Sequence, residues 1–205
     1  MAAVNVTSVV PGNCEVEFTA PFSFTIEYEC LYPLESDLEW KMTYVGSADD
    51  DSQDQLLDSV LVGPVLQGNY KFVFEGNAPD HNKINEEDIL GVTVVLLTCS
   101  YKGKEFIRIG YYVNNDYSDE ELKENPPSKP NIPAITRTLL ADHPRVTRFP
   151  IDFDNYALPQ SAATAIEVIE DIVAQDHENF MDVEDDYARD IMDTNDHMMM
   201  KTECA

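Results

Sequence analysis

Positive charge is scarce in this sequence. Its 13 lysines and arginines face 39 aspartates and glutamates, so the 205 residues have a formal net charge of −26. A field of this sign repels phosphates, which nearly excludes direct binding of DNA or RNA and favours basic partners. Acidity is also typical of proteins that are merely soluble, so the charge alone does not identify a partner.

A leader sequence and long apolar runs are missing as well. The first residues, Met1–Val6, lack the cationic region that begins a secretory signal. The longest apolar stretch, Gly91–Cys99, is far shorter than the roughly 20 residues that a membrane helix needs. We therefore expect a soluble, intracellular chain with no membrane partner.

Motifs for catalysis and metal binding are also absent. The four cysteines form no CxxC pair, and the four histidines have neither ligand spacing nor a paired nucleophile. No Gly-x-Ser-x-Gly, P-loop or His-Glu-x-x-His motif occurs. The acidic run Asp49–Asp51 lacks the glycine turn and the final glutamate of an EF-hand loop. We expect no enzyme, no cofactor and no metal site, which leaves binding.

Several segments before Asn155 have the alternation of β-strands. In the clearest case, Phe22–Cys30, phenylalanine, isoleucine, tyrosine and cysteine occupy one face of the strand, while serine, threonine and glutamate occupy the other. Short strands separated by turn residues predict an all-β, immunoglobulin-like sandwich. A capping box at Ser118–Glu121 predicts one short helix. The expected strands are Phe22–Cys30, Leu38–Tyr44, Tyr70–Phe74, Gly91–Tyr101 and Glu105–Val113.

The composition changes near Asn155. Residues 1–155 contain 26 acidic and 11 basic residues, whereas residues 156–205 contain 13 acidic and 2 basic residues. We predict a folded core over 1–155 and a mostly disordered acidic tail over 156–205. Within the tail, Ile166, Ile169 and Val173 recur at helical spacing. This segment is either a helix that forms on a partner or a nascent helix without a role.

Cys30, Trp40 and Cys99 occur in the order that is typical of an extracellular immunoglobulin domain, and Asn5 begins a glycosylation sequon. Against that alternative, the chain shows no secretory signal. The tyrosine-corner position two residues before the second cysteine is Leu97. We expect Cys30 and Cys99 to be buried free thiols, because free cysteine behaves as a small core hydrophobe.

Eight collinear blocks within about residues 4–155 resemble the anti-silencing function family of histone chaperones. One such block would be weak evidence, but eight in the same order are specific, and only the tail lies outside the match. The blocks are Asp37–Lys41, Tyr44–Ala48, Leu57–Val65, Gly91–Cys99, Glu105–Arg108, Gly110–Asn115, Glu124–Pro127 and Pro144–Phe149.

The resemblance implies a sandwich that binds one dimer of histones three and four and blocks the joining of two dimers. It implies transfer of the dimer to the HIRA complex and to the replication-coupled chromatin assembly factor, for nucleosome assembly and disassembly. We expect a monomer in the nucleus with a cytoplasmic pool. The charge of −26 suits such basic partners. A generic acidic adaptor for other basic proteins is the alternative.

The resemblance also implies a surface for histone three. Its centre is Val92, Val94 and Leu96, which share one strand face. From the residues alone, a run that is apolar on both faces is more typical of core, and the resemblance reverses that interpretation. The family often has glutamate at position 49, so the shorter aspartate puts that contact in question. The implied residues are Val45, Ala48, Asp49, Asp54, Asp88, Val92, Val94, Leu96, Arg108, Tyr111 and Tyr112.

Two further sites are implied. One is an edge strand that receives the carboxyl-terminal segment of histone four by β-augmentation, although a plain edge without a ligand fits the residues equally well. The other is an acidic groove for a short basic hairpin of the assembly factors, in which Ser36 interrupts the acidic run. The edge residues are Val6, Leu140, Pro144, Arg145, Val146 and Thr147. The groove residues are Asp37, Glu39, Asp58, Val60, Leu61, Val62, Pro64 and Phe72.

Overall fold

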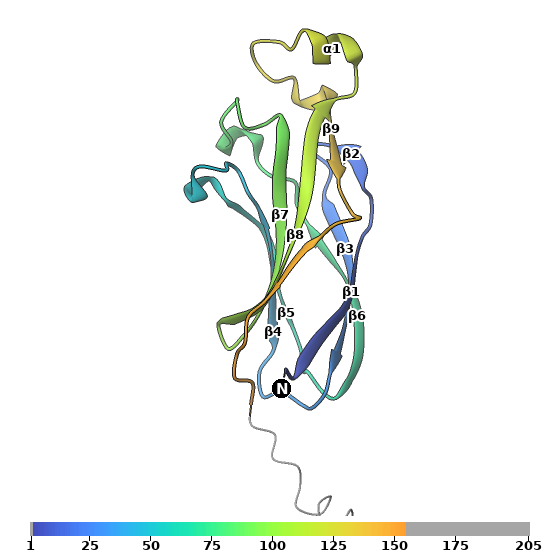
Figure 1. Cartoon of the computed structure of the whole chain (residues 1–205), viewed down its shortest axis with the longest axis vertical. Coiled ribbons are helices and arrows are strands. Elements are labelled where there is room, and N and C mark those ends of the chain that lie inside the picture. Colours follow the sequence, from blue (N-terminus) through green and yellow to red (C-terminus); the bar gives the residue numbers. More distant parts are fainter. Residues whose placement is uncertain (1, 155–205) are drawn as a thin grey trace, which may run out of the picture. The chain divides into compact units, whose positions relative to one another are not determined.

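Two β-sheets pack face to face in the computed structural model, which describes residues 2–154 (Figure 1). The smaller sheet has the strand order β1 (Val4–Pro11), β3 (Phe22–Cys30), β6 (Gly68–Gly76). The larger sheet has the order β2 (Glu15–Glu17), β9 (Ile135–Leu139), β8 (Lys104–Tyr117), β7 (Gly91–Tyr101), β4 (Leu38–Tyr44), β5 (Gln55–Val62). The last strand, β10 (Arg145–Arg148), pairs with β8 beside β9. The prediction of an all-β sandwich is confirmed.

The core forms because the strands alternate as expected. Strand β3 alternates buried and half-buried residues along its whole length, and β4 does the same. Trp40, Phe24 and Leu97 are each fully buried between the sheets. Burial of such side chains contributes about 1.5–3 kcal/mol each and is the main stabilising term.

The one α-helix among residues 2–154, α1 (Glu120–Glu124), lies at one end of the sandwich (Figure 1). Its N-cap is Asp119, whose side chain accepts a hydrogen bond from the Glu121 amide at 2.8 Å. The sequence-based prediction began the capping box one residue too early, at Ser118. Serine and aspartate both cap helices well, but here the cap is the Asp119 carboxylate and not Ser118.

Three 3-10 turns, Asp51–Gln53, His81–Lys83 and Ile132–Ala134, complete the described elements. No helix among the described residues is long and apolar enough to cross a membrane. In residues 2–154, no group of three or more histidine, cysteine, aspartate or glutamate side chains could hold a metal ion. The predicted domain boundary, the disorder of 156–205 and the helix near Ile166 lie outside the described residues.

Both predicted core thiols are free. Cys30 and Cys99 are buried, and neither forms a disulfide. Burial raises the pKa of each thiol. The buried free thiols argue against the extracellular immunoglobulin interpretation, which would join these two residues.

Candidate protein-binding surfaces

The outer face of β7 carries an exposed apolar row. Because successive side chains of a strand point to opposite faces, Val95 and Leu97 lie in the core while Val92, Val94 and Leu96 face outward. The Val92 side chain is 67 % exposed. An exposed apolar row of this kind is more typical of an interface than of a solvated strand.

Strand β8 extends this row sideways. Tyr112 pairs with Val94 and is 44 % exposed, whereas Gly110 pairs with Leu96 and has no side chain. A Cβ atom at Gly110 would lie 3.3 Å from Leu96 Cδ2 and 3.4 Å from Val94 Cγ1. The glycine therefore leaves a shallow hollow of about 350 Å³ between the apolar row and β10. The hollow is lined by Val45, Val94, Leu96, Arg108, Gly110, Tyr112, Arg145, Thr147 and Phe149.

Tyr111 does not belong to this surface. It is 1 % exposed, its hydroxyl donates to the Val9 carbonyl at 3.0 Å, and its ring packs on Phe24 at 5.3 Å. The resemblance placed Tyr111 and Tyr112 together at the border of the patch. Neighbouring residues on a strand face opposite ways, so only Tyr112 can meet a partner there, and Tyr111 is a core residue.

The loop that follows β4 borders the other side of the row. The Val45 amide donates to the Val94 carbonyl at 3.0 Å, which fixes this loop to β7. A second hollow of about 190 Å³ brings Val45 and Ala48 together with Asp88, Val92 and Tyr112. The apolar row is thus bordered on this side by the carboxylates of Glu87 and Asp88.

The remaining polar residues of the expected histone-three surface are more scattered. Asp49 and Asp54 flank the 3-10 turn Asp51–Gln53 and line neither hollow. Burial raises the pKa of Asp54, although a hydrogen bond from the Gly46 backbone opposes this effect. Arg108 lines the first hollow, where Glu105 already accepts its hydrogen bonds at 2.8 and 3.1 Å.

Strand β10 forms an edge beside the apolar row. Arg145 pairs with Gly110 and Thr147 pairs with Arg108, and both residues line the first hollow. Pro144 precedes the strand, and Val146, 45 % exposed, alternates with Arg145 and Thr147 along it. Among residues 2–154, no strand pairs with the outer side of β10. The edge is therefore available for strand addition.

Two members of the expected histone-four set lie outside strand β10. The Leu140 amide donates to the Tyr112 carbonyl at 2.9 Å, and its side chain is 48 % exposed. Val6 lies on β1 in the other sheet and is 8 % exposed. It lines a separate cleft, so the structure divides the predicted set between two sheets.

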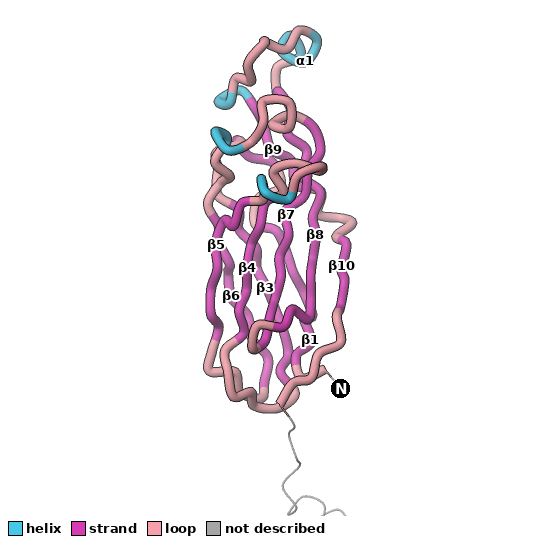
Figure 2. The backbone as a smooth tube through the Cα atoms, turned by 90° about the vertical axis from the view of Figure 1, so that its left-hand side faces the viewer, coloured by secondary structure: helices cyan, strands magenta, loops and turns pink. Residues whose placement is uncertain are grey.

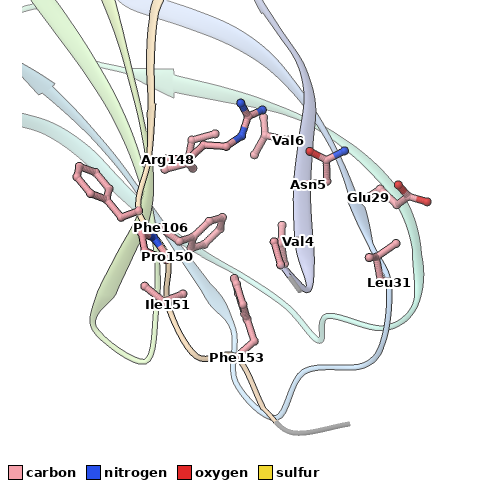
Figure 3. A pocket seen from close by; sticks show the side chains of 13 residues that line it. Val4, Asn5, Val6, Glu29, Leu31, Phe106, Arg148, Pro150, Ile151 and Phe153 are labelled. Atoms are coloured by element: carbon pink, nitrogen blue, oxygen red, sulfur yellow. The ribbon is translucent and has the colours of Figure 1, made fainter. Parts of the chain in front are cut away.

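This cleft lies between β1 and the chain that follows β10 (Figure 3). Its volume is about 660 Å³, and apolar side chains from both sheets line it. Sequence reasoning missed its aromatic residues, although the spacing of Phe149, Ile151 and Phe153 at every second position was a usable signal. The cleft is lined by Ala2, Val4, Asn5, Val6, Glu29, Leu31, Phe106, Ile107, Arg148, Phe149, Pro150, Ile151 and Phe153.

The expected acidic groove lies at β5, the opposite edge of the larger sheet from β10 (Figure 2). Asp58, Val60 and Val62 pair with the inward residues of β4. Phe72, from the smaller sheet, packs edge-on against Trp40 at 5.9 Å. These contacts place the four predicted groove residues along the border between the two sheets.

The other predicted groove residues are divided. Leu61 is 66 % exposed and pairs with Glu39, which is bonded to Lys41 at 2.9 Å on the outer face. The Asp37 carboxylate lies against Gly63, which precedes the exposed Pro64. Asp37 is therefore the acidic residue nearest this turn, and the charge of Glu39 is partly neutralised by Lys41.

Together, the sandwich and these surfaces define a protein-binding β-sandwich. The family model of the ASF1 like histone chaperones matches residues 1–154. The chain is 59 % identical over 165 residues to the probable histone chaperone ASF1A of Arabidopsis thaliana, covering 80 % of this chain and 84 % of that protein. It is 54 % identical over 154 residues to the histone chaperone asf1 of Drosophila melanogaster, covering 75 % and 71 % of the two chains.

A third relative, the histone chaperone asf1 of Dictyostelium discoideum, is 53 % identical over 154 residues, which cover 75 % of this chain and all of that protein. The chain belongs to the ASF1 family of histone chaperones. Both the family resemblance and the expectation of a non-enzymatic protein are confirmed, because these relatives are named as histone chaperones.

Proposed function

We propose that this chaperone binds a single dimer of histones three and four and covers the surface through which two dimers would join. It then transfers the dimer to chromatin assembly factors, in the nucleus and from a cytoplasmic pool. The single observation that carries this proposal is the exposed apolar row of β7, which continues across the first hollow to the edge of β10 that no strand of residues 2–154 covers.

The apolar row suits the carboxyl-terminal helices of histone three. Val92, Val94 and Tyr112 form an exposed apolar centre, and tyrosine is a typical anchor of protein interfaces. Asp88 lies at the border of this centre. A basic helix can therefore bury apolar side chains in the middle while its charges meet carboxylates around them.

The edge of β10 suits an extended strand of histone four. Strand addition would satisfy the outer backbone groups of Arg145–Arg148, which pair with no strand among the described residues. An apolar side chain of the added strand would enter the cleft beside Val6. Backbone pairing supplies affinity in such a mode, and the cleft supplies specificity.

The predicted groove residues around β5 suit the basic hairpins of the HIRA complex and of the replication-coupled chromatin assembly factor. In the larger sheet, strands β8, β7 and β4 separate β10 from β5. This separation allows a histone dimer and an assembly factor to be bound at the same time. Transfer would then begin from a ternary complex.

Gel filtration of the full chain with refolded histones three and four, in moderate salt, tests this proposal. We expect one co-eluting complex. The dimer of the other two core histones is the matched control. It is also strongly basic, but it lacks the helices of histone three and the strand of histone four that the proposed surfaces would bind. Equal co-elution of both histone pairs would contradict the proposal and favour a generic acidic adaptor.

A further inference from the structure

The chain after β10 folds back onto the larger sheet as a strap, which we define as residues 149–154. The Phe149 amide donates to the Phe106 carbonyl at 2.9 Å, so the strap starts beside β8. The Phe153 ring packs against Tyr101 at 5.5 Å and against Phe106 at 5.3 Å. Tyr101 and Phe106 belong to the hairpin of β7 and β8.

The last residue of the strap is held by three donors. The Asp154 carboxylate accepts hydrogen bonds from Lys102 Nζ at 2.6 Å, from the Glu35 amide at 2.9 Å and from the Tyr101 hydroxyl. Lys102 Nζ also donates to Glu35 Oε2 at 2.8 Å. The Asp154 side chain is 17 % exposed and that of Lys102 is 44 % exposed, so the carboxylate is the better shielded partner of this ion pair.

The strap forms one wall of the cleft (Figure 3). Phe149, Pro150, Ile151 and Phe153 line the cleft from this side, and β1 lines it from the other. If the strap were released, the cleft would lose this wall. The hydrogen bond from the Phe149 amide to the Phe106 carbonyl, which continues the pairing of β10 with β8 beyond Arg148, would also be lost.

We propose that Asp154 is a positioning residue for histone binding, because it fastens the strap that forms the wall of the cleft. This inference rests on the proposed function, in which a strand of histone four occupies the edge of β10 and the cleft. Asp154 itself does not line the cleft. It acts through Phe153 and the rest of the strap.

The charge of Asp154 persists under ordinary conditions. Burial opposes ionisation, but the hydrogen bonds from Lys102 and Tyr101 outweigh it and lower the pKa of Asp154 to about 2. The stabilisation from this carboxylate is therefore complete above the unfolded pKa of about 4 and is lost as the pH falls towards 2. At neutral pH, Asp154→Asn removes a full charge while keeping the shape of the side chain.

Amide hydrogen exchange and peptide binding, both on the full chain, test the positioning role. In Asp154→Asn we expect the amides of Glu35 and Phe149 to exchange at least tenfold faster. We expect the affinity for a synthetic carboxyl-terminal peptide of histone four to fall about tenfold, with little change in the thermal midpoint. Tyr101→Phe keeps the ring contact with Phe153 but removes one donor, so its effects should be intermediate.

The matched control is Glu120→Gln, which removes the charge that pairs with Lys123 Nζ at 3.0 Å on α1, at the other end of the sandwich. It should behave as wild type in both assays. If Asp154→Asn binds the peptide like wild type, or if its amides do not exchange faster, the positioning role is refuted. If the wild-type chain fails to bind the peptide, the proposed histone-four site itself is refuted, and the role of the cleft is refuted with it.

Discussion

Val94→Arg should remove histone binding while leaving the sandwich folded. Val94 is partly exposed on the outer face of β7, opposite Tyr112 on β8 and beside the space left by Gly110. An arginine there can extend its charged end into water along this surface. We expect a folding cost of at most about 1 kcal/mol, from the lost β-branched side chain.

The expected loss in binding is much larger. Burial of the valine side chain against a partner is worth about 1.5–3 kcal/mol, and that contribution is lost. A guanidinium desolvated against a basic partner without a carboxylate adds a penalty of about 2–5 kcal/mol. The sum of roughly 3.5–8 kcal/mol corresponds to a loss of about 300-fold or more in affinity.

Circular dichroism melts measure the folding cost of Val94→Arg, and histone pull-downs measure its loss in binding. The thermal midpoint should fall by no more than about 4 °C, while capture of histones three and four should disappear. Val73→Arg is the matched control, because Val73 is a strand valine in the smaller sheet and is 59 % exposed. It should melt and bind like wild type. A folded Val94→Arg protein that still captures histones would refute the proposed surface, and an unfolded one would show that Val94 is core.

Three further expectations follow from the same structure. Deletion of residues 156–205 should leave the thermal midpoint nearly unchanged and modestly weaken histone affinity at low salt; a fall of many degrees would contradict the 155/156 boundary. Replacement of Asp37 and Glu39 by alanine should lower the affinity for a basic hairpin peptide about tenfold in a titration, while capture of histones three and four persists. Asp37 should account for most of this loss, because Glu39 already forms an ion pair with Lys41. Arg137→Met should lower the free energy of unfolding in urea by about 2–4 kcal/mol, because Arg137 is 2 % exposed and its guanidinium donates to the carbonyls of Phe18 and Pro21, which lose these bonds. A variant as stable as wild type would show that water reaches these carbonyls.

Strands β3 and β4 were predicted from their alternation, which arises because one side of each meets the core and the other does not. Strand β7 was predicted from its nearly continuous run of β-branched residues and leucines, which is typical of a central strand. Strands β1 and β5 were missed, since edge strands also expose apolar side chains such as Val10, at 54 %, and Leu61, at 66 %. Strands β2 and β10 have only 3 and 4 residues, too few for a periodic signal.

The candidate surfaces were predicted less completely than the fold. Alternation within Gly91–Cys99 put Val92, Val94 and Leu96 on one face, but it was the family resemblance that predicted this face to point outward, as it does. A motif match does not say which of two neighbouring tyrosines faces outward, and the pairing of Tyr112 with Val94 decides this. The spacing of Phe149, Ile151 and Phe153 could indicate one wall of the cleft, but β1, which forms the other wall, is far away in the sequence, so no local pattern could predict that the two meet.

The proposed covering of the histone dimer is tested most directly by the mass of the purified complex. Light scattering on the co-eluting peak should give a mass equal to one 23.1 kDa chain plus one copy each of histones three and four. That stoichiometry requires that the bound dimer cannot join a second one. A mass with two copies of each histone would show that the outer face of β7 and β8 leaves the joining surface free, and would contradict the account.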